Sequence, residues 1–397
     1  MLRPWQSPVL GHRDLRIDWL RGLVMTCVII DHSKISSLLT WVTYERFWTV
    51  TAAEVFVVLS GVVLGMVYGR KLNRGDWFPV IRGLAHRALT LYLAFLAVTL
   101  SVVVLGLIGI DVRPLTTFND QVAGFVELLD PQRMGAQAWR DIALMRSGPW
   151  AFQIIGLYVW LVAAAVPCLF ALRYAGWRPV VALSWGLYLW YRLSPHALTT
   201  GQFEVTFPIL AWQLLFVHGV VIGYHRERIA GLAARVPRIV PIAVTAASVL
   251  FIVFALSNPW TDGPLHWDVV SADRFTDLYF RYFTLTNLGI GRVLNLAVAL
   301  PVGYALLTAA WRMASPLGAV FVTLGQQSLG AFVLHVYGIL LIAHMPLAQT
   351  DGLWINTLIQ ISLVLAIAVL LKGMHRWKLR RPSVATTAAA PARPLAA

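Results

Sequence analysis

The chain has 397 residues, of which 58% are hydrophobic and only 13% are charged; its mean hydropathy is +0.70 and its net charge is +14. A soluble fold cannot bury that much apolar surface, so the composition excludes a set of soluble domains and predicts a polytopic membrane protein. In such a protein the positive charge indicates basic cytoplasmic loops rather than nucleic-acid binding.

Motifs for bound cofactors are missing from the sequence. Its two cysteines, Cys27 and Cys168, lie in apolar runs, which excludes a disulfide framework, a cysteine-rich zinc site and an iron–sulfur cluster. There is no P-loop, no glycine-rich dinucleotide motif and no HExxH. We therefore expect no metal and no permanently bound cofactor. Because the first apolar run contains Asp18 and Arg21, we also expect no cleavable signal peptide.

Ten apolar segments predict transmembrane helices, the fifth being the shortest. They lie at 16–36, 50–69, 84–110, 150–172, 179–193, 206–225, 238–256, 289–308, 317–343 and 353–373. We expect an all-α polytopic bundle of about ten transmembrane helices over 16–375. A cytoplasmic segment, 1–15, precedes it, and a cytoplasmic tail, 376–397, follows that is basic and then disordered.

The distribution of charge between the loops predicts the orientation. With the N-terminus in the cytoplasm, the inner segments hold 20 basic residues and three acids, and the outer segments hold nine basic residues and 12 acids. This asymmetry favours two cytoplasmic termini. When the basic residues at the span ends, Arg16, Lys34, Arg192, Arg238 and Lys372, are counted with the loops, three basic and three acidic residues remain inside spans. A charge there is costly unless it is paired or hydrated. The six residues are Asp18, Arg21, Asp31, Glu54, Arg87 and Arg292.

The first span, IDWLRGLVMTCVIIDHSK, places three of its polar residues on one helical face. Arg21 and His32 are eleven residues apart, so they differ by about 20° around the axis and by about 16 Å along it, and Asp18 is about 60° from Arg21. One face therefore carries a cation near the cytoplasmic end and an imidazole near the outer end.

Other polar residues extend these two ends into clusters. At the outer level we expect Glu54, His335 and Arg292 near His32, at the inner level Arg82 and Arg87 near Arg21 and Asp18, and Gln213 near mid-depth. A neutral imidazole beside a carboxylate is suited to act as general base for a sugar hydroxyl, and inner cations suit a phosphorylated ligand from the cytoplasm. A pantetheine arm along the Arg21–His32 face has the reach to join the two clusters.

These residues resemble a known family. Arg21 and His32 form the R-x10-H motif of the acyltransferase family 3 superfamily of membrane acyltransferases, and the second span, AAEVFVVLSGVVLGMVYGRKL, is similar to its OpgC branch. The similarity covers about 12–375, and the further stretches that agree are IRGLAHRALTLYLAF, QIIGLYVWLVAAAVPCL, WQLLFVHGVVIG, GRVLNLAVAL and LGQQSLGAFVLHV.

The resemblance implies a bacterial inner-membrane O-acyltransferase that moves a succinyl group from cytoplasmic succinyl-CoA to hydroxyls of a periplasmic glucan. Its partners are then acyl-CoA, the glucan and membrane lipid, with no nucleic acid. The motif carries over to His32 as general base and to Arg21. We extend it to Asp18 (orienting the inner end), Glu54 (partner of His32), Arg87 (CoA phosphates) and Arg292 (a cation that selects succinyl).

Two alternatives remain open from the sequence. Intramembrane carboxylates and histidines also serve proton relays, so the chain could be a proton-coupled glycan exporter, although we find no paired halves and expect no broken helices. Acetyl transfer to another envelope polysaccharide or to lipopolysaccharide would keep the mechanism and change both substrates. The sequence carries no signal for an oligomeric state.

Overall fold

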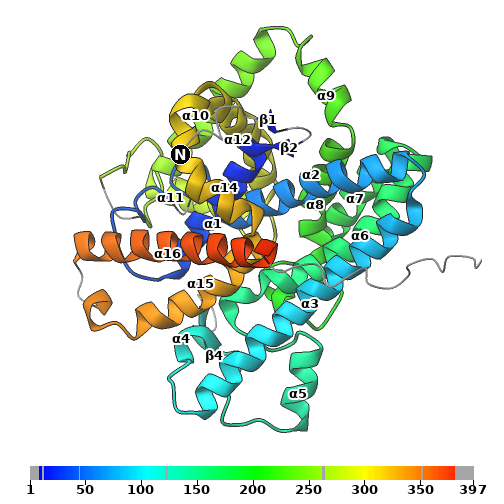
Figure 1. Cartoon of the computed structure of the whole chain (residues 1–397). Helices are drawn as coiled ribbons and strands as arrows, with labels where there is room; N and C mark the ends of the chain where they lie inside the picture. The colour runs from blue at the N-terminus through cyan, green and yellow to red at the C-terminus, as the bar shows by residue number, and fades with distance from the viewer. Residues whose placement is uncertain are drawn as a thin grey trace, which may run out of the picture.

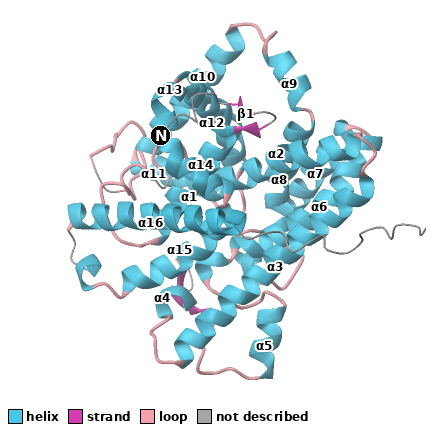
Figure 2. Cartoon of the chain, viewed as in Figure 1, coloured by secondary structure: helices cyan, strands magenta, loops and turns pink. Residues whose placement is uncertain are grey.

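Helices form nearly all of the regular structure in this computed structural model, which describes residues 9–10, 13–43, 45–120, 124–261, 264–349 and 352–380 (Figures 1 and 2). The predicted all-α class is confirmed. The strands of the described residues form two short antiparallel hairpins, β1 (Val9–Leu10) with β2 (Arg13–Asp14) and β3 (Thr117–Asp120) with β4 (Gly124–Glu127). Their registers pair Val9 with Asp14 and Thr117 with Glu127.

Eight helices lie between residues 15 and 224. They are α1 (Leu15–His32), α2 (Ala52–Asn73), α3 (Trp77–Leu107), α4 (Arg113–Thr116), α5 (Ala136–Ala143), α6 (Ile154–Tyr174), α7 (Trp177–Leu193) and α8 (Ile209–Tyr224). Short 3-10 turns, η2 (Trp150–Phe152) and η3 (Gln202–Val205), precede α6 and α8. Helix α1 starts where the carboxylate of Asp14 accepts a hydrogen bond from the backbone N–H of Arg16, which caps the helix.

The rest of the chain is also helical. Its helices are α9 (Arg226–Ala233), α10 (Ile239–Leu256), α11 (Ala272–Leu278), α12 (Ile290–Ala309), α13 (Trp311–Ala314), α14 (Gly318–Gln326), α15 (Ser328–Ala343) and α16 (Leu353–Arg380). A π-helical turn, η4 (Tyr279–Phe283), follows α11, and 3-10 turns lie at η5 (Ser315–Leu317) and η6 (Pro346–Gln349). Because α16 runs to Arg380, the expected tail begins as helix, and 381–397 lie outside the described residues.

Each of the ten predicted segments contains helix. Only some of these helices have the length and composition of a membrane span. Within the described residues six helices are long and apolar enough to cross a membrane: Ala52–Asn73, Trp77–Leu107, Trp150–Tyr174, Ile239–Leu256, Ile290–Ala309 and Leu353–Trp377. Helix α1 is continuous, but its sequence contains several charged residues, and α7 and α8 are only 17 and 16 residues long. The protein is thus a membrane protein, while ten spans and cytoplasmic termini stay predictions.

The ninth predicted span, 317–343, is broken, and our expectation of unbroken helices was wrong. The segments Trp311–Gln326 and Ser328–Ala343 meet at 92°, and counted as one span they would make a seventh. Gln327 between them has a φ of −115° and a ψ of 36°, outside the helical region. Hydropathy records how long an apolar segment is and not its direction, so it could not show this bend.

Close packing against α1 fixes the direction of α14. A Cβ atom placed on Gly22 would lie 1.7 Å from the carbonyl oxygen of Phe321, and one on Gly325 would lie 1.9 Å from that of Asp18. Helices α2 and α8 approach in the same way, since a Cβ on Gly61 would lie 2.3 Å from the carbonyl oxygen of Phe216. Small residues at such spacing let membrane helices pack backbone to backbone.

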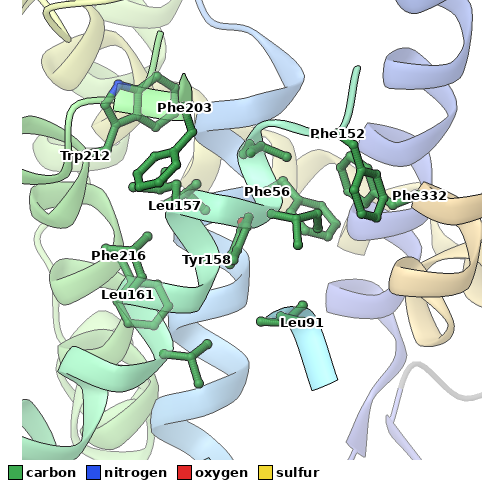
Figure 3. Close-up of a cluster of buried hydrophobic side chains, with 14 of the residues drawn as sticks. Phe56, Leu91, Phe152, Leu157, Tyr158, Leu161, Phe203, Trp212, Phe216 and Phe332 are labelled. Carbon is green, nitrogen blue, oxygen red and sulfur yellow. The ribbon is translucent and has the colours of Figure 1, made fainter. Parts of the chain in front are cut away.

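The main core lies where α2, α6, α8 and α15 meet. Figure 3 shows part of it, with Phe56 lying between Tyr158 of α6 and Phe332 of α15. The rings of Phe56 and Tyr158 are 5.7 Å apart and those of Phe56 and Phe332 are 5.3 Å apart, both edge to face. This aromatic cluster joins α2 to the two helices on either side of it.

Candidate functional site

Two polar contacts join α1 to α15, one near each end of the seam between them. Arg21 Nη2 donates to Ser328 Oγ at 2.7 Å, and His32 Nδ1 lies 3.2 Å from His335 Nε2. Ser328 and His335 are seven residues apart, about two helical turns, so they share one face of α15 as Arg21 and His32 share one face of α1. The predicted face therefore exists, and α15 supplies its partners.

At the end of the seam that holds His32 and His335, a chain of hydrogen bonds fixes which ring nitrogens carry a proton. The carbonyl oxygen of Phe332 can only accept, so Nδ1 of His335, 2.5 Å away, carries a hydrogen. In the neutral ring Nε2 of His335 is then bare and accepts from Nδ1–H of His32. Nε2 of His32 keeps its lone pair, and among the described residues none hydrogen-bonds it. This is the protonation state that a general base needs.

At the other end of the seam, Arg21 is only 6% exposed and its guanidinium is incompletely satisfied. Its Nε is buried and has no hydrogen-bond partner within the described part of the chain, and its ring partner is Phe56, 5.4 Å away. Asp18 is bound by Arg13, at 2.5 and 3.1 Å, and by Gln326 at 3.3 Å. Asp18 lies near Arg21 but takes its hydrogen bonds from other residues, so it fixes the start of α1 against α14.

Apolar side chains occupy the interval between the two ends. The ring of Phe332 lies 5.3 Å from Phe56 and 5.4 Å from His335, so a continuous row of rings connects Arg21 to the histidine pair. Met25 and Ile29, on the α1 segment between Arg21 and His32, are 0% and 1% exposed. A ligand that reaches from one end to the other must displace some of these side chains.

Glu54 does not pair with His32, and that expectation was wrong. Both of its carboxylate oxygens bind Arg292, at 2.5 and 2.9 Å, and the second also accepts from the backbone N–H and hydroxyl of Thr51. Glu54 is the third residue of α2 and closes a capping box with Thr51, a Thr-x-x-Glu signal that the sequence contained. The capping box at the start of α2 thus holds the Glu54 carboxylate where it meets Arg292 and not His32.

Arg292, expected to meet the acyl group, is fully buried in an ion cluster. Its remaining nitrogen, Nη1, donates to Glu45 at 2.7 Å and to the carbonyl oxygen of Phe283 at 2.9 Å. All three guanidinium nitrogens are therefore engaged, and the side chain has no exposed surface. In this arrangement Arg292 holds α12 to α2 and is enclosed by protein, out of reach of a ligand.

The other predicted residues are divided between the interior and the surface. Gln213 on α8 is buried and saturated, because it accepts from Ser184 Oγ and donates to the carbonyl oxygens of Ser184 and Leu210. Arg82 and Arg87 are exposed on α3, and Arg87 is close enough to Arg21 to interact with it electrostatically. The structure thus gathers Arg21, Asp18, Arg87, His32 and His335 along the α1–α15 seam and leaves Gln213 in a helix–helix contact.

A hollow of about 520 Å³ begins at Ser33, the residue after His32, and its lining does not include His32 itself. We call it the outer hollow, after the predicted orientation; its polar lining consists of Ser33, Lys34, Asp111, Arg113 and Thr117. The ring of Trp150 lies 5.0 Å from that of His32, and the Lys34 ammonium lies 4.2 Å above the same indole. The two carboxylate oxygens of Asp111 bind Arg113 at 2.6 to 2.8 Å, which lowers the pKa of Asp111 to about 2.

A second hollow, the basic hollow, has a volume of about 410 Å³ and lies between the end of α2 and the start of α9. Its charged lining is Arg70, Arg74, Arg226, Glu227 and Arg228, together with His225. Buried Nη1 of Arg226 and Nε2 of His225 have no hydrogen-bond partner among the described residues. Arg226 also interacts electrostatically with Tyr304, whose hydroxyl donates to Asp14 at the cap of α1. The basic hollow thus lies within electrostatic reach of the start of α1.

Sequence reasoning missed Ser328, Trp150 and Lys34. Ser328 lies in LGQQSLGAFVLHV, seven residues before His335, and this two-turn spacing could have linked the two. Lys34 is one of the nine basic residues assigned to the outer segments, and its sequence context does not distinguish it from the other eight. Nothing in the sequence connects Trp150 to His32, because 118 residues separate them.

A protein-family model described as OpgC protein matches residues 13–379. No curated protein and no solved structure matches the chain. The match includes α1 from its capping residue, the whole α1–α15 seam and nearly all of α16. The chain therefore belongs to the OpgC family, and this membership makes it a membrane transferase that acts on glucans.

Proposed function

We propose that the protein is a bacterial inner-membrane O-acyltransferase that moves a succinyl group from cytoplasmic succinyl-CoA to hydroxyls of a periplasmic glucan. Membership of the OpgC family supports the transferase class and the glucan. The resemblance of Arg21 and His32 to the R-x10-H motif of acyltransferase family 3 supports the thioester donor. The observation that carries the mechanism is the bare Nε2 of His32, a ring that His335 orients and that directly precedes Ser33 in the lining of the outer hollow.

In the proposed reaction Nε2 of His32 takes the proton of a glucan hydroxyl. The hydroxyl oxygen attacks the carbonyl carbon of the thioester, an ester C–O bond forms and the C–S bond breaks. His32 then returns its proton to the departing CoA sulfur, so no net proton is left on the enzyme. His335 touches no reacting atom in this scheme and acts as a positioning residue, because it fixes the tautomer and the plane of His32.

Cations at the Arg21 end support entry of the donor from that side. CoA carries several phosphates, and the basic hollow presents four arginines, Arg70, Arg74, Arg226 and Arg228, against one acid, Glu227. Arg21 and Arg87 continue this positive region along the seam. The pantetheine arm would then replace the apolar packing around Phe56 and Phe332 to bring the thioester to His32.

The proposal is tested with the protein in lipid vesicles that contain trapped glucan. Labelled succinyl-CoA is added outside, and succinylated glucan is measured inside, with His32→Ala as the control. We expect label on the glucan only with the wild-type protein. Absence of labelled glucan, with correctly inserted wild-type protein in both orientations, would refute the proposal.

The break between α14 and α15 favours one competing function, a glycan exporter, because discontinuous helices frequently form transporter binding sites. In the same vesicles an exporter would move unmodified glucan across the membrane when acyl-CoA is left out. Competition between succinyl-CoA and acetyl-CoA in this assay separates succinyl transfer from acetyl transfer to another polysaccharide.

A further inference from the structure

Lys34 is an exposed cation close to the histidine pair. Its ammonium lies 4.2 Å from the centre of the Trp150 ring, and the ring of His32 lies 5.0 Å from the same indole. The ammonium is therefore within about 9 Å of the imidazole, and the two groups interact electrostatically. Lys34 and Trp150 place a positive charge at the outer hollow, beside the base.

Charge within the outer hollow is unbalanced. Asp111 and Arg113 neutralise each other through a two-pronged ion pair. Lys34 forms no ion pair with a carboxylate of the described residues, and its side chain is exposed. The described lining of the hollow thus has one uncompensated positive charge, which an anionic ligand would neutralise.

The backbone holds Lys34 in this position against its own preference. Its φ is 55°, in the left-handed region that a residue with a side chain seldom adopts. A buried network fastens the loop on both sides of it, because Gln360 donates to Ser33 Oγ at 2.8 Å and accepts from Ser37 Oγ at 2.5 Å. Such an overdetermined backbone fixes the direction in which the side chain leaves the loop, and the contact with Trp150 then places the ammonium.

We infer that the outer hollow contains a carboxylate subsite in which Lys34 binds the free carboxylate of a dicarboxylic acyl group while its thioester carbon lies at His32. This inference rests on the proposed function and assigns to Lys34 the selective role that we had expected of Arg292. A four-carbon diacid spans about 4 Å between its end carbons, and with hydrogen-bond contacts added at both ends it is long enough to join two groups that lie at most about 9 Å apart.

The test compares two donors that differ in the carboxylate alone, succinyl-CoA and butyryl-CoA. Lys34→Met keeps the apolar stem on Trp150 and removes the charge, and it should lower the ratio of kcat/KM for succinyl-CoA to that for butyryl-CoA by about 10- to 100-fold. Lys34→Arg should restore most of that ratio. Lys71→Met is the matched control, because Lys71 also lies over an aromatic ring, 5.6 Å from Tyr68, and should leave the ratio unchanged.

An unchanged ratio of the two kcat/KM values in Lys34→Met would overturn the subsite, whether or not both values fall. A binding measurement separates this outcome from failure of the proposed reaction. The chain has only four lysines, Lys34, Lys71, Lys372 and Lys378, so NMR signals of ¹³C-dimethylated lysines are few enough to assign by substitution. Succinate should shift the Lys34 signal and butyrate should not. That shift in a protein that transfers neither group would refute the reaction and support the subsite, whereas no shift would refute the subsite.

Discussion

Two groups of buried charges in this membrane protein look alike in sequence and differ in the structure. In the ion cluster of Glu45, Glu54 and Arg292, all three guanidinium nitrogens are engaged by protein oxygens. In the α1–α15 seam, Nε of Arg21 and Nε2 of His32 have no partner in the part of the chain that the structure describes. Charges at membrane depth are costly in either case, so the difference lies in what remains for a ligand to satisfy.

Burial of a charge inside a membrane domain is therefore a poor guide to catalysis. A saturated cluster holds helices together, and a cluster with free donors or lone pairs binds or reacts. This distinction assigns Glu54 and Arg292 to the fold and Arg21, His32 and His335 to the proposed reaction.

The largest effect is expected at His32. Replacing it with glutamine keeps a polar side chain of similar size and removes the base, so kcat for succinyl transfer should fall by about 10²- to 10⁴-fold. Thermal unfolding in detergent should change little. A variant with more than a tenth of the wild-type rate would remove His32 from the role of base.

Arg292→Met should act on stability and not on the reaction. Loss of this guanidinium leaves Glu54 and Glu45 buried without their partner, at a cost of about 3–5 kcal/mol in the free energy of unfolding. The midpoint of thermal or denaturant unfolding measures this, and activity should follow the amount of folded protein. Adding Glu54→Gln should recover part of the loss. A stable variant with a raised KM for succinyl-CoA would return Arg292 to the binding site.

His335 offers a sharper test of the seam. His335→Leu removes the acceptor for Nδ1–H of His32, which should cost about 1–3 kcal/mol in the transition state, or roughly 10- to 100-fold in kcat, with KM for the donor unchanged. His335→Gln retains an acceptor oxygen and should lose less. Equal losses in both variants, accompanied by equal losses of stability, would indicate packing alone.

The smallest effect is expected at Gln213, which resembles the ion cluster in being saturated. Gln213→Leu breaks the contact with Ser184 and should lower the free energy of unfolding by about 1 kcal/mol. The kinetic constants of the folded protein should not change, and Ser184→Ala in the same chain should restore most of the stability. A changed KM for glucan would show that Gln213 contacts the substrate.

Much of the fold followed from local pattern. Apolar run length predicted a helix in each of the ten segments, and the eleven-residue spacing placed Arg21 and His32 on one face, which α15 now covers. The break at Gln327 did not follow, because apolar residues continue on both sides of it and only the packing of α14 on α1 turns the chain.

The membrane class, the helical segments and the polar face of α1 could all be predicted from the amino-acid sequence, since each depends on residues close together in the chain. Which buried charge meets which partner became visible only in the packed helices. His32 contacts His335, which lies 303 residues away in the sequence, and Glu54 contacts Arg292, which lies 238 residues away. Helical periodicity fixes the direction in which a side chain points, but the neighbouring helix that it meets depends on packing between helices, and local pattern carries no record of that packing.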